Sequence, residues 1–242
     1  MKNLAIIPAR CGSKGLKDKN IKSLDGKPLL VYSIEAAINS NLFDEVHVST
    51  DSRVYADIAI KHGAQVPFLR SIQLATDNAS SWDVVREVIE RYKLEGKTYD
   101  MVTLLQPTAP LRTGEHIIEA YNVFISNKAN AVVSVCEVEH SPLWCNTLPD
   151  DHSMDNFIDK KISKLPRQQL EVFYRINGAI YMLNTEYFNS CESIYDSKCL
   201  AYIMKKEHSI DIDDEFDFDL AKAIMDMENK NSSITDSQGE KK

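Results

Sequence analysis

The chain lacks the sequence signals of several protein classes. Its five cysteines form no C-x-x-C pair, which argues against a zinc knuckle or a dithiol redox motif. It has neither an apolar run near the ~18 residues of a membrane span nor a secretory pattern at its start. An odd number of cysteines fits free thiols in a reducing compartment. We therefore expect a cytoplasmic protein without a membrane partner.

Positive charge is also in short supply. The 242 residues include 28 lysines and arginines against 36 aspartates and glutamates, which gives a net charge of -8. Nucleic-acid binders usually carry a basic surface, so this balance argues against a nucleic-acid partner. With 43% hydrophobic residues, the chain can bury the core of one large α/β domain.

Several cofactor and catalytic motifs are missing as well. No G-x-G-x-x-G follows the first apolar run, which argues against a dinucleotide-dependent dehydrogenase. Gly96-Lys97-Thr98 ends like a phosphate-binding P-loop, but Arg91 stands where the first glycine of that motif belongs. There is no G-x-S-x-G of a hydrolase, and the six histidines show no metal-binding spacing.

The most informative stretch that is present lies at the start of the chain. Leu4 to Ile7 is a continuous apolar run, typical of a strand buried on both faces. The loop that follows, to Asn20, holds two glycines, one arginine and three lysines. Glycines let backbone amides approach a ligand, and the cations can neutralise a polyanion. The stretch predicts a nucleoside triphosphate site, with an ordinary solvated turn as the alternative.

The rest of the chain alternates between strand and helix patterns. We expect strands near residues 4–7, 46–50, 65–69, 101–105, 131–135, 173–183 and 200–204. We expect helices near residues 28–39, 53–62, 80–92 and 114–127, and one that ends near residue 227. This alternation indicates a doubly wound sheet, in which ligands bind at the carboxyl ends of the strands.

Two segments depart from this pattern. Prolines interrupt residues 139–171, and we interpret this segment as an inserted arm of one domain that spans residues 1–228. The arm carries apolar residues that need burial, either against a symmetric partner subunit or against this chain's own core. Residues 229–242 are polar and are expected to form a disordered tail.

A pair of carboxylates near the end of the chain is the second informative feature. If residues 209–213 are extended, Ile210 and Ile212 face one way and Asp211 and Asp213 the other. Two convergent carboxylates together with substrate phosphates are a common way to hold Mg²⁺. We expect the later acids, Asp217 and Asp219, to cap the next helix instead.

Five motifs in order resemble those of the acylneuraminate cytidylyltransferases, the CMP-sialic acid synthetases. They are Ile7–Asn20, Leu105–Arg112, Pro166–Gln168, Asn177–Tyr181 and Ser209–Asp213. The resemblance covers about residues 3 to 225. It implies a Rossmann-like nucleotide-diphospho-sugar transferase fold, with a mostly parallel sheet flanked by helices. It also implies a homodimer whose arms reach into each other's sites.

The resemblance further implies a set of site residues. The CTP site would comprise Arg10, Lys14, Asn20, Arg70, Ala79, Ser81, Gln106 and Thr108. The sugar-acid site would comprise Gln106, Arg167, Gln168, Asn177 and Tyr181. The catalytic set would be Arg10, Lys14, Asp211 and Asp213, with the two aspartates holding Mg²⁺. The products would be a CMP-sugar and pyrophosphate.

Two positions depart from the family pattern, and several functions stay open. Cys11 stands where a glycine or another small residue is common, and Ser71 follows Arg70 where proline is frequent. Acetylated neuraminic acid is the leading substrate, followed by legionaminic acid and then the eight-carbon acid of lipopolysaccharide. A catalytically silent nucleotide- or sugar-binding protein is the alternative from another class.

Overall fold

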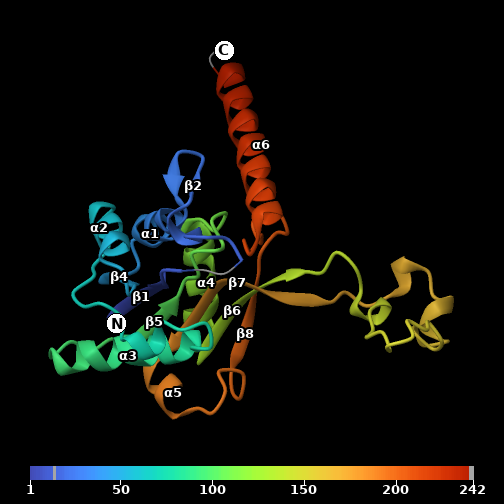
Figure 1. Ribbon diagram of the computed structural model, residues 1–242, viewed down its shortest axis with the longest axis horizontal. Helices are drawn as coiled ribbons and strands as arrows, with labels where there is room; N and C mark the ends of the chain where they lie inside the picture. Colours follow the sequence, from blue (N-terminus) through green and yellow to red (C-terminus); the bar gives the residue numbers. More distant parts are fainter. Residues whose placement is uncertain (13–14, 240–242) are drawn as a thin grey trace.

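A six-stranded mixed sheet forms the centre of the computed structural model, which describes residues 1–12 and 15–239, with side chains to residue 230. The strand order is β4-β1-β5-β7-β6-β8. Neighbouring strands are parallel except at β7, which runs antiparallel to both β5 and β6. The strands are β1 (Asn3–Pro8), β4 (Glu45–Ser49), β5 (Met101–Leu104), β6 (Ala131–Glu137), β7 (Tyr174–Asn184) and β8 (Cys199–Ile203). The predicted class, a mostly parallel sheet flanked by helices, is confirmed (Figure 1).

Helices cover both faces of this sheet. They are α1 (Leu29–Asn39), α2 (Arg53–Lys61), α3 (Ser81–Leu94), α4 (Gly114–Ser126), α5 (Thr185–Ser190) and α6 (Glu215–Gly239). Their starts follow from local chemistry: the Ser80 hydroxyl accepts a bond from the Trp82 amide, and Thr113 with His116 forms a capping box. A short ribbon, β2 (Ser23–Leu24) with β3 (Lys27–Pro28), precedes α1.

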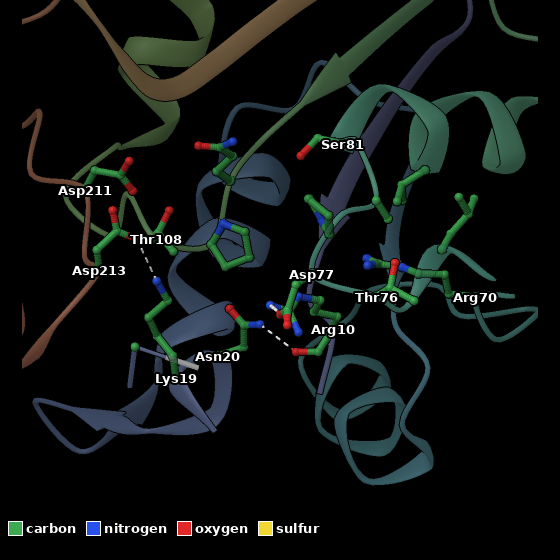
Figure 2. A pocket seen from close by; sticks show the side chains of 17 residues that line it. Arg10, Lys19, Asn20, Arg70, Thr76, Asp77, Ser81, Thr108, Asp211 and Asp213 are labelled. Carbon is green, nitrogen blue, oxygen red and sulfur yellow. Dashed lines mark hydrogen bonds and ion pairs between the residues drawn. The ribbon is translucent and has the colours of Figure 1, made fainter. Parts of the chain in front are cut away.

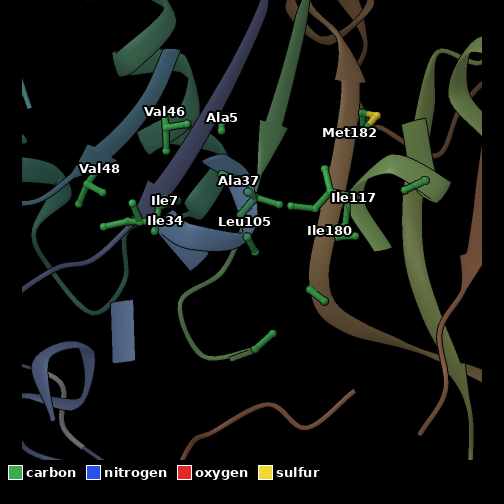
Figure 3. Packing of buried hydrophobic residues seen from close by; sticks show 14 of the residues in the cluster. Ala5, Ile7, Ile34, Ala37, Val46, Val48, Leu105, Ile117, Ile180 and Met182 are labelled. Atoms are coloured by element: carbon green, nitrogen blue, oxygen red, sulfur yellow. The ribbon is translucent and has the colours of Figure 1, made fainter. Parts of the chain in front are cut away.

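The buried core lies on both sides of β1, as its apolar run predicts. Ala5 and Ile7 pack on one face with side chains of α1 and α4 (Figure 3). Leu4 and Ile6 pack on the other face with side chains of α3. All four are fully buried, because successive side chains of a central strand point to opposite faces.

Two predicted elements differ from the structure. Only a single bridge, between Gln65 and His47, forms where a strand at 65–69 is expected. Helix α6 continues to Gly239, well beyond the predicted end near Met227 and into the predicted disordered tail. No proline or glycine interrupts the chain between Glu215 and Gly239, so nothing in the local sequence stops the helix.

The chain between β6 and β7 projects away from the sheet as an arm (Figure 1). Three short 3-10 turns are its only regular elements among residues 139–171, all of which the structure describes. None of these residues is buried, and the apolar Leu148 and Met154 are each more than half exposed. The arm therefore does not pack as a flap on this chain's own core.

The helices also bear on the membrane prediction. Across residues 1–12 and 15–239, no helix combines the length and the apolar character that crossing a membrane needs.

Candidate active site

A cavity of about 550 Å³ opens at the carboxyl ends of β1 and β5 (Figure 2). Four segments line it: the loop after β1, the stretch from Arg70 to α3, the loop after β5, and the chain before α6. The lining residues predicted from the sequence are Arg10, Asn20, Arg70, Ala79, Ser81, Gln106, Thr108, Asp211 and Asp213. The cavity thus brings together residues that lie up to two hundred positions apart in the chain.

The loop after β1 presents Arg10 to the cavity. One guanidinium nitrogen, Nη2, lies 2.5 Å from Asp77 Oδ1, and Nη1 donates to the Gly12 carbonyl oxygen at 3.2 Å. Asn20 is buried and donates to the Arg10 carbonyl oxygen at 3.0 Å, which fixes the backbone beneath this arginine. Lys14 lies outside the described residues, so its role stays a prediction.

Arg70 lies on the same side of the cavity as Arg10 and is held rigidly (Figure 2). Its Nε donates to Ser49 Oγ at 3.0 Å and its Nη2 to the Ser49 carbonyl oxygen at 2.6 Å. Burial lowers the pKa of Arg70 to about 10, so it keeps its charge at neutral pH. Ser71 stands where proline is frequent, and its amide, which proline lacks, donates to the Glu87 carboxylate at 3.1 Å.

The acidic side of the cavity comes from the extended chain before α6. Ile212 is fully buried among side chains of α1 and α6, so Asp211 and Asp213 face the cavity as predicted. Burial raises the pKa of Asp211, and the charge of Asp213 raises it further, while a hydrogen bond from Thr108 opposes both. Asp217 caps the next helix, as expected: its Oδ2 accepts from the amide of Asp214, the residue before α6, at 3.2 Å, and its own amide donates to Asp214 Oδ1 at 3.0 Å.

Lys19 links the basic loop to the acidic segment, and the sequence analysis did not assign it a role. Its Nζ lies 3.0 Å from Asp213 Oδ1 and 2.5 Å from the Ile212 carbonyl oxygen. Gly15 allows this approach, because a Cβ there would lie 2.7 Å from the Asp213 carbonyl oxygen. Thr76 and Asp77 also line the cavity and were missed. The position of Lys19 and Gly15 in the basic loop could have identified them as site residues, whereas no local sequence pattern identifies Asp77.

The predicted sugar-binding residues on β7 lie elsewhere than in the lining of this cavity. Asn177 is 1% exposed; it accepts from Ser134 Oγ at 2.6 Å and donates to Ser209 Oγ at 2.8 Å. Tyr181 packs edge-on against Trp82, and burial raises its pKa to about 12. In this structure Asn177 therefore connects β6, β7 and the segment before Asp211. Contact of either residue with a sugar stays a prediction.

Arg167 and Gln168 lie on the arm, in a 3-10 turn at Arg167–Gln169. Arg167 donates to the Glu139 carbonyl oxygen at 2.6 Å, a contact within the arm. Neither residue lines the 550 Å³ cavity of its own chain. Their assignment to the sugar therefore depends on a second subunit.

Comparison with known proteins agrees with the fold and the motifs. Residues 4–239 match the family model described as Cytidylyltransferase. The N-acylneuraminate cytidylyltransferase of Escherichia coli is 43% identical over 95% of this chain and 53% of its own length. The CMP-N,N'-diacetyllegionaminic acid synthase of Legionella pneumophila is 35% identical over 94% of this chain and 97% of its own length.

The fold is also similar to that of a solved structure. The structure of a CMP:2-keto-3-deoxy-manno-octonic acid synthetase complexed with CTP superposes with a TM-score of 0.71, over 94% of this chain and 100% of the synthetase chain. At 15% identity, this likeness concerns the fold alone. The chain spans about half the length of the first curated relatives it matches. Because the family model matches nearly the whole chain, the chain belongs to the cytidylyltransferase family.

Proposed function

We propose that this protein is a Mg²⁺-dependent cytidylyltransferase that joins CTP to a nonulosonic acid and releases pyrophosphate. The observation that carries the proposal is one cavity with a basic side, Arg10 and Arg70, and an acidic side, Asp211 and Asp213. A volume of about 550 Å³ suits a nucleotide-sized ligand. The basic side fits a triphosphate, and the acidic side fits a metal ion beside it.

We assign the nucleotide to the half of the cavity that holds the positively charged side chains. Arg10 would fork onto phosphate oxygens and stabilise the charge that develops on the departing pyrophosphate, together with Lys14. Arg70 is held by Ser49 and would contact the base or ribose with little loss of side-chain entropy on binding. Ala79 and Ser81 lie on the same side, where a small side chain and a hydroxyl leave room for the nucleoside.

Asp211 and Asp213 fit a hard divalent cation. The pKa of Asp211 is raised by burial and by its neighbouring carboxylate, and a bound cation would relieve both effects. In the part of the chain that the structure describes, no group of three or more histidine, cysteine and acidic side chains could hold a metal. Phosphate oxygens and water would therefore complete the shell, as is usual for Mg²⁺. When bound, the ion would supply charge neutralisation at the reacting phosphate.

The reaction forms one P–O bond and breaks one P–O bond and one O–H bond. The anomeric hydroxyl oxygen of the sugar acid attacks the α-phosphorus and gives up its proton to water, while the bond from the α-phosphorus to the α,β-bridging oxygen breaks and pyrophosphate leaves with that electron pair. The ion pair with Lys19 holds the Asp213 carboxylate in place, and a hydrogen bond from Thr108 holds that of Asp211. The chain's own contribution is thus the alignment of the phosphates and the two carboxylates before the attack.

The carboxylate of the sugar acid would be bound by Arg167 and Gln168 of a partner subunit. These residues lie on an arm that has no buried residue in a single chain. Its exposed apolar side chains, Leu148 and Met154 among them, would be covered in a homodimer. A dimer of this kind would account for the absence of Arg167 and Gln168 from the cavity of their own chain.

The relatives' names point to the substrate class. N-acetylneuraminate is the first candidate, because the Escherichia coli N-acylneuraminate cytidylyltransferase is 43% identical. Diacetyllegionaminate is the second, because the relative of that name matches over 97% of its own length. The two acids share the carboxylate and ring that Arg167 and Gln168 would contact.

The test is pyrophosphate release with CTP, measured with N-acetylneuraminate, with diacetyllegionaminate, with the eight-carbon acid and with no acid, each with and without Mg²⁺. Release with one nonulosonic acid, dependent on Mg²⁺, supports the proposal and identifies the substrate. Release with both acids means that the site selects the ring and carboxylate rather than the acyl groups. CTP binding without release for any acid would refute the proposal in favour of a silent binding protein.

A further inference from the structure

A fully buried arginine lies directly behind the cavity wall. Arg112 follows the loop after β5, and both of its hydrogen-bond acceptors are neutral main-chain oxygens. Its Nη1 donates to the Gln106 carbonyl oxygen at 3.2 Å and to the Ala179 carbonyl oxygen at 2.9 Å. Its Nε and Nη2 have no hydrogen-bond partner among the described residues. A charge buried without a carboxylate partner is costly, so the presence of Arg112 here suggests a role in the site.

The two carbonyls belong to neighbouring segments, of which only the loop after β5 lines the cavity. Gln106 lies in the loop after β5 and lines the cavity, and Ala179 follows Gly178 on the neighbouring strand β7. Ser33 of α1 also donates to the Gln106 carbonyl oxygen, at 3.2 Å. The Gln106 backbone is therefore held from two sides.

Gly178 provides the space for the Gln106 side chain. Its φ is +74°, a conformation that favours glycine. A Cβ at this position would overlap Gln106 Oε1 and lie 3.5 Å from Asp211 Oδ2. The Gln106 amide thus occupies the volume that any other residue at 178 would fill, beside the carboxylate of Asp211.

We propose that Gly178 and Arg112 are positioning residues that hold the Gln106 amide between the nucleotide half of the cavity and Asp211, where it selects and orients the sugar acid. This proposal rests on the proposed cytidylyltransferase function. An amide can donate and accept at once, so it suits a group flanked by the acid's hydroxyls and carboxylate. Gly178 acts by leaving space, and Arg112 acts by tying the Gln106 loop to β7.

The first experiment compares Gly178→Ala with Gly96→Ala. Gly96 has a φ of +79° and nothing within 4 Å of an added Cβ, so its variant carries the same kind of backbone strain without a steric clash. In Gly178→Ala we expect kcat/KM for N-acetylneuraminate or diacetyllegionaminate to fall at least tenfold, while the Kd for CTP changes less than twofold. In Gly96→Ala both values are expected to stay within twofold of the unmodified protein. Equal kinetics for the two variants would overturn the role of Gly178.

A double-mutant cycle with Gln106→Ala separates steric coupling from general damage. Truncation at Gln106 removes the atoms that the new Cβ would strike. Gly178→Ala is therefore expected to lower the urea midpoint of unfolding more in the unmodified protein than in the Gln106→Ala protein. Equal losses in the two backgrounds would refute the proposed packing. This readout needs no substrate, so it stays decisive if no acid is turned over, an outcome that would instead overturn the proposed function.

Arg112→Lys tests the second positioning residue. Lysine keeps the charge but cannot reproduce the planar fork that spans two carbonyls. We expect KM for the sugar acid to rise at least fivefold, with the Kd for CTP within twofold and near-native circular dichroism. A parallel loss of CTP affinity and sugar affinity would contradict the proposed selective effect on the sugar acid. If the variant does not fold, the Gly178 cycle decides the proposal.

Discussion

Asp77 occupies the position at Arg10 that a phosphate group of CTP would need. Arg10 Nη2 and Asp77 Oδ1 are 2.5 Å apart, and the two side chains are 27% and 34% exposed. Under the proposed function, the triphosphate must replace Asp77 at this guanidinium. Asp77→Asn removes the charge while keeping the shape of the side chain, and we expect it to tighten CTP binding.

The size of the gain follows from the exposure of the pair. Partly exposed ion pairs stabilise by about 0.2–1 kcal/mol, and we place this pair at the upper end because its two charged atoms are close together. If the triphosphate no longer has to replace an ion pair that stabilises by about 1 kcal/mol, CTP binding becomes more favourable by that amount. Since about 1.4 kcal/mol corresponds to a tenfold change, we expect a roughly fivefold lower Kd for CTP.

Isothermal titration of CTP into each protein, without sugar acid, measures this change. Asp83→Asn is the matched control, because Asp83 pairs with Arg86 on the exposed side of α3 and lies outside the cavity. The gain is expected to shrink as salt is raised, since exposed charges are screened. Unchanged or weaker CTP binding in Asp77→Asn would refute the reasoning and indicate that Asp77 contacts the nucleotide itself.

Three further predictions follow from the site and the core. Asp211→Ala is expected to abolish pyrophosphate release, because one carboxylate would hold Mg²⁺ poorly; retained activity would refute the metal assignment. Arg167→Ala is expected to raise KM for the sugar acid far more than KM for CTP, and equal effects on both KM values would contradict its role. In mixed dimers of the Arg167→Ala and Asp211→Ala chains, one of the two sites combines an intact Asp211 with an intact Arg167, so activity is expected to return there. His47 is buried and its pKa is lowered to about 3, so below pH 6.5 only the unfolded chain takes up its proton. The free energy of unfolding is therefore expected to fall by up to ~1.4 kcal/mol per pH unit between pH 6.5 and 3 through this residue, and His47→Gln is expected to flatten that slope in urea titrations at pH 7, 6 and 5.

Local patterns were enough to predict most of the regular elements. The apolar run Leu4–Ile7 forms the buried strand β1, and the helix patterns at 28–39, 53–62 and 114–127 appear with boundaries close to those expected. These elements follow from hydrophobic periodicity, which a single stretch of sequence carries. The antiparallel direction of β7 does not follow from such periodicity, because strand direction depends on how the arm returns the chain to the sheet.

The sequence by itself determined the chemical types of the site: a basic glycine-containing loop at the end of a buried strand, and a pair of aspartates that alternate with buried isoleucines. Only the tertiary structure decided which of these groups meet. It brought Lys19 to Asp213 and Asp77 to Arg10, and it placed Asn177 among buried hydroxyls. It also set Gly178 of β7 against Gln106 of the loop after β5, a contact that no local pattern encodes. Such contacts depend on the packing of segments far apart in the chain, whereas residue type and spacing specify only each segment on its own.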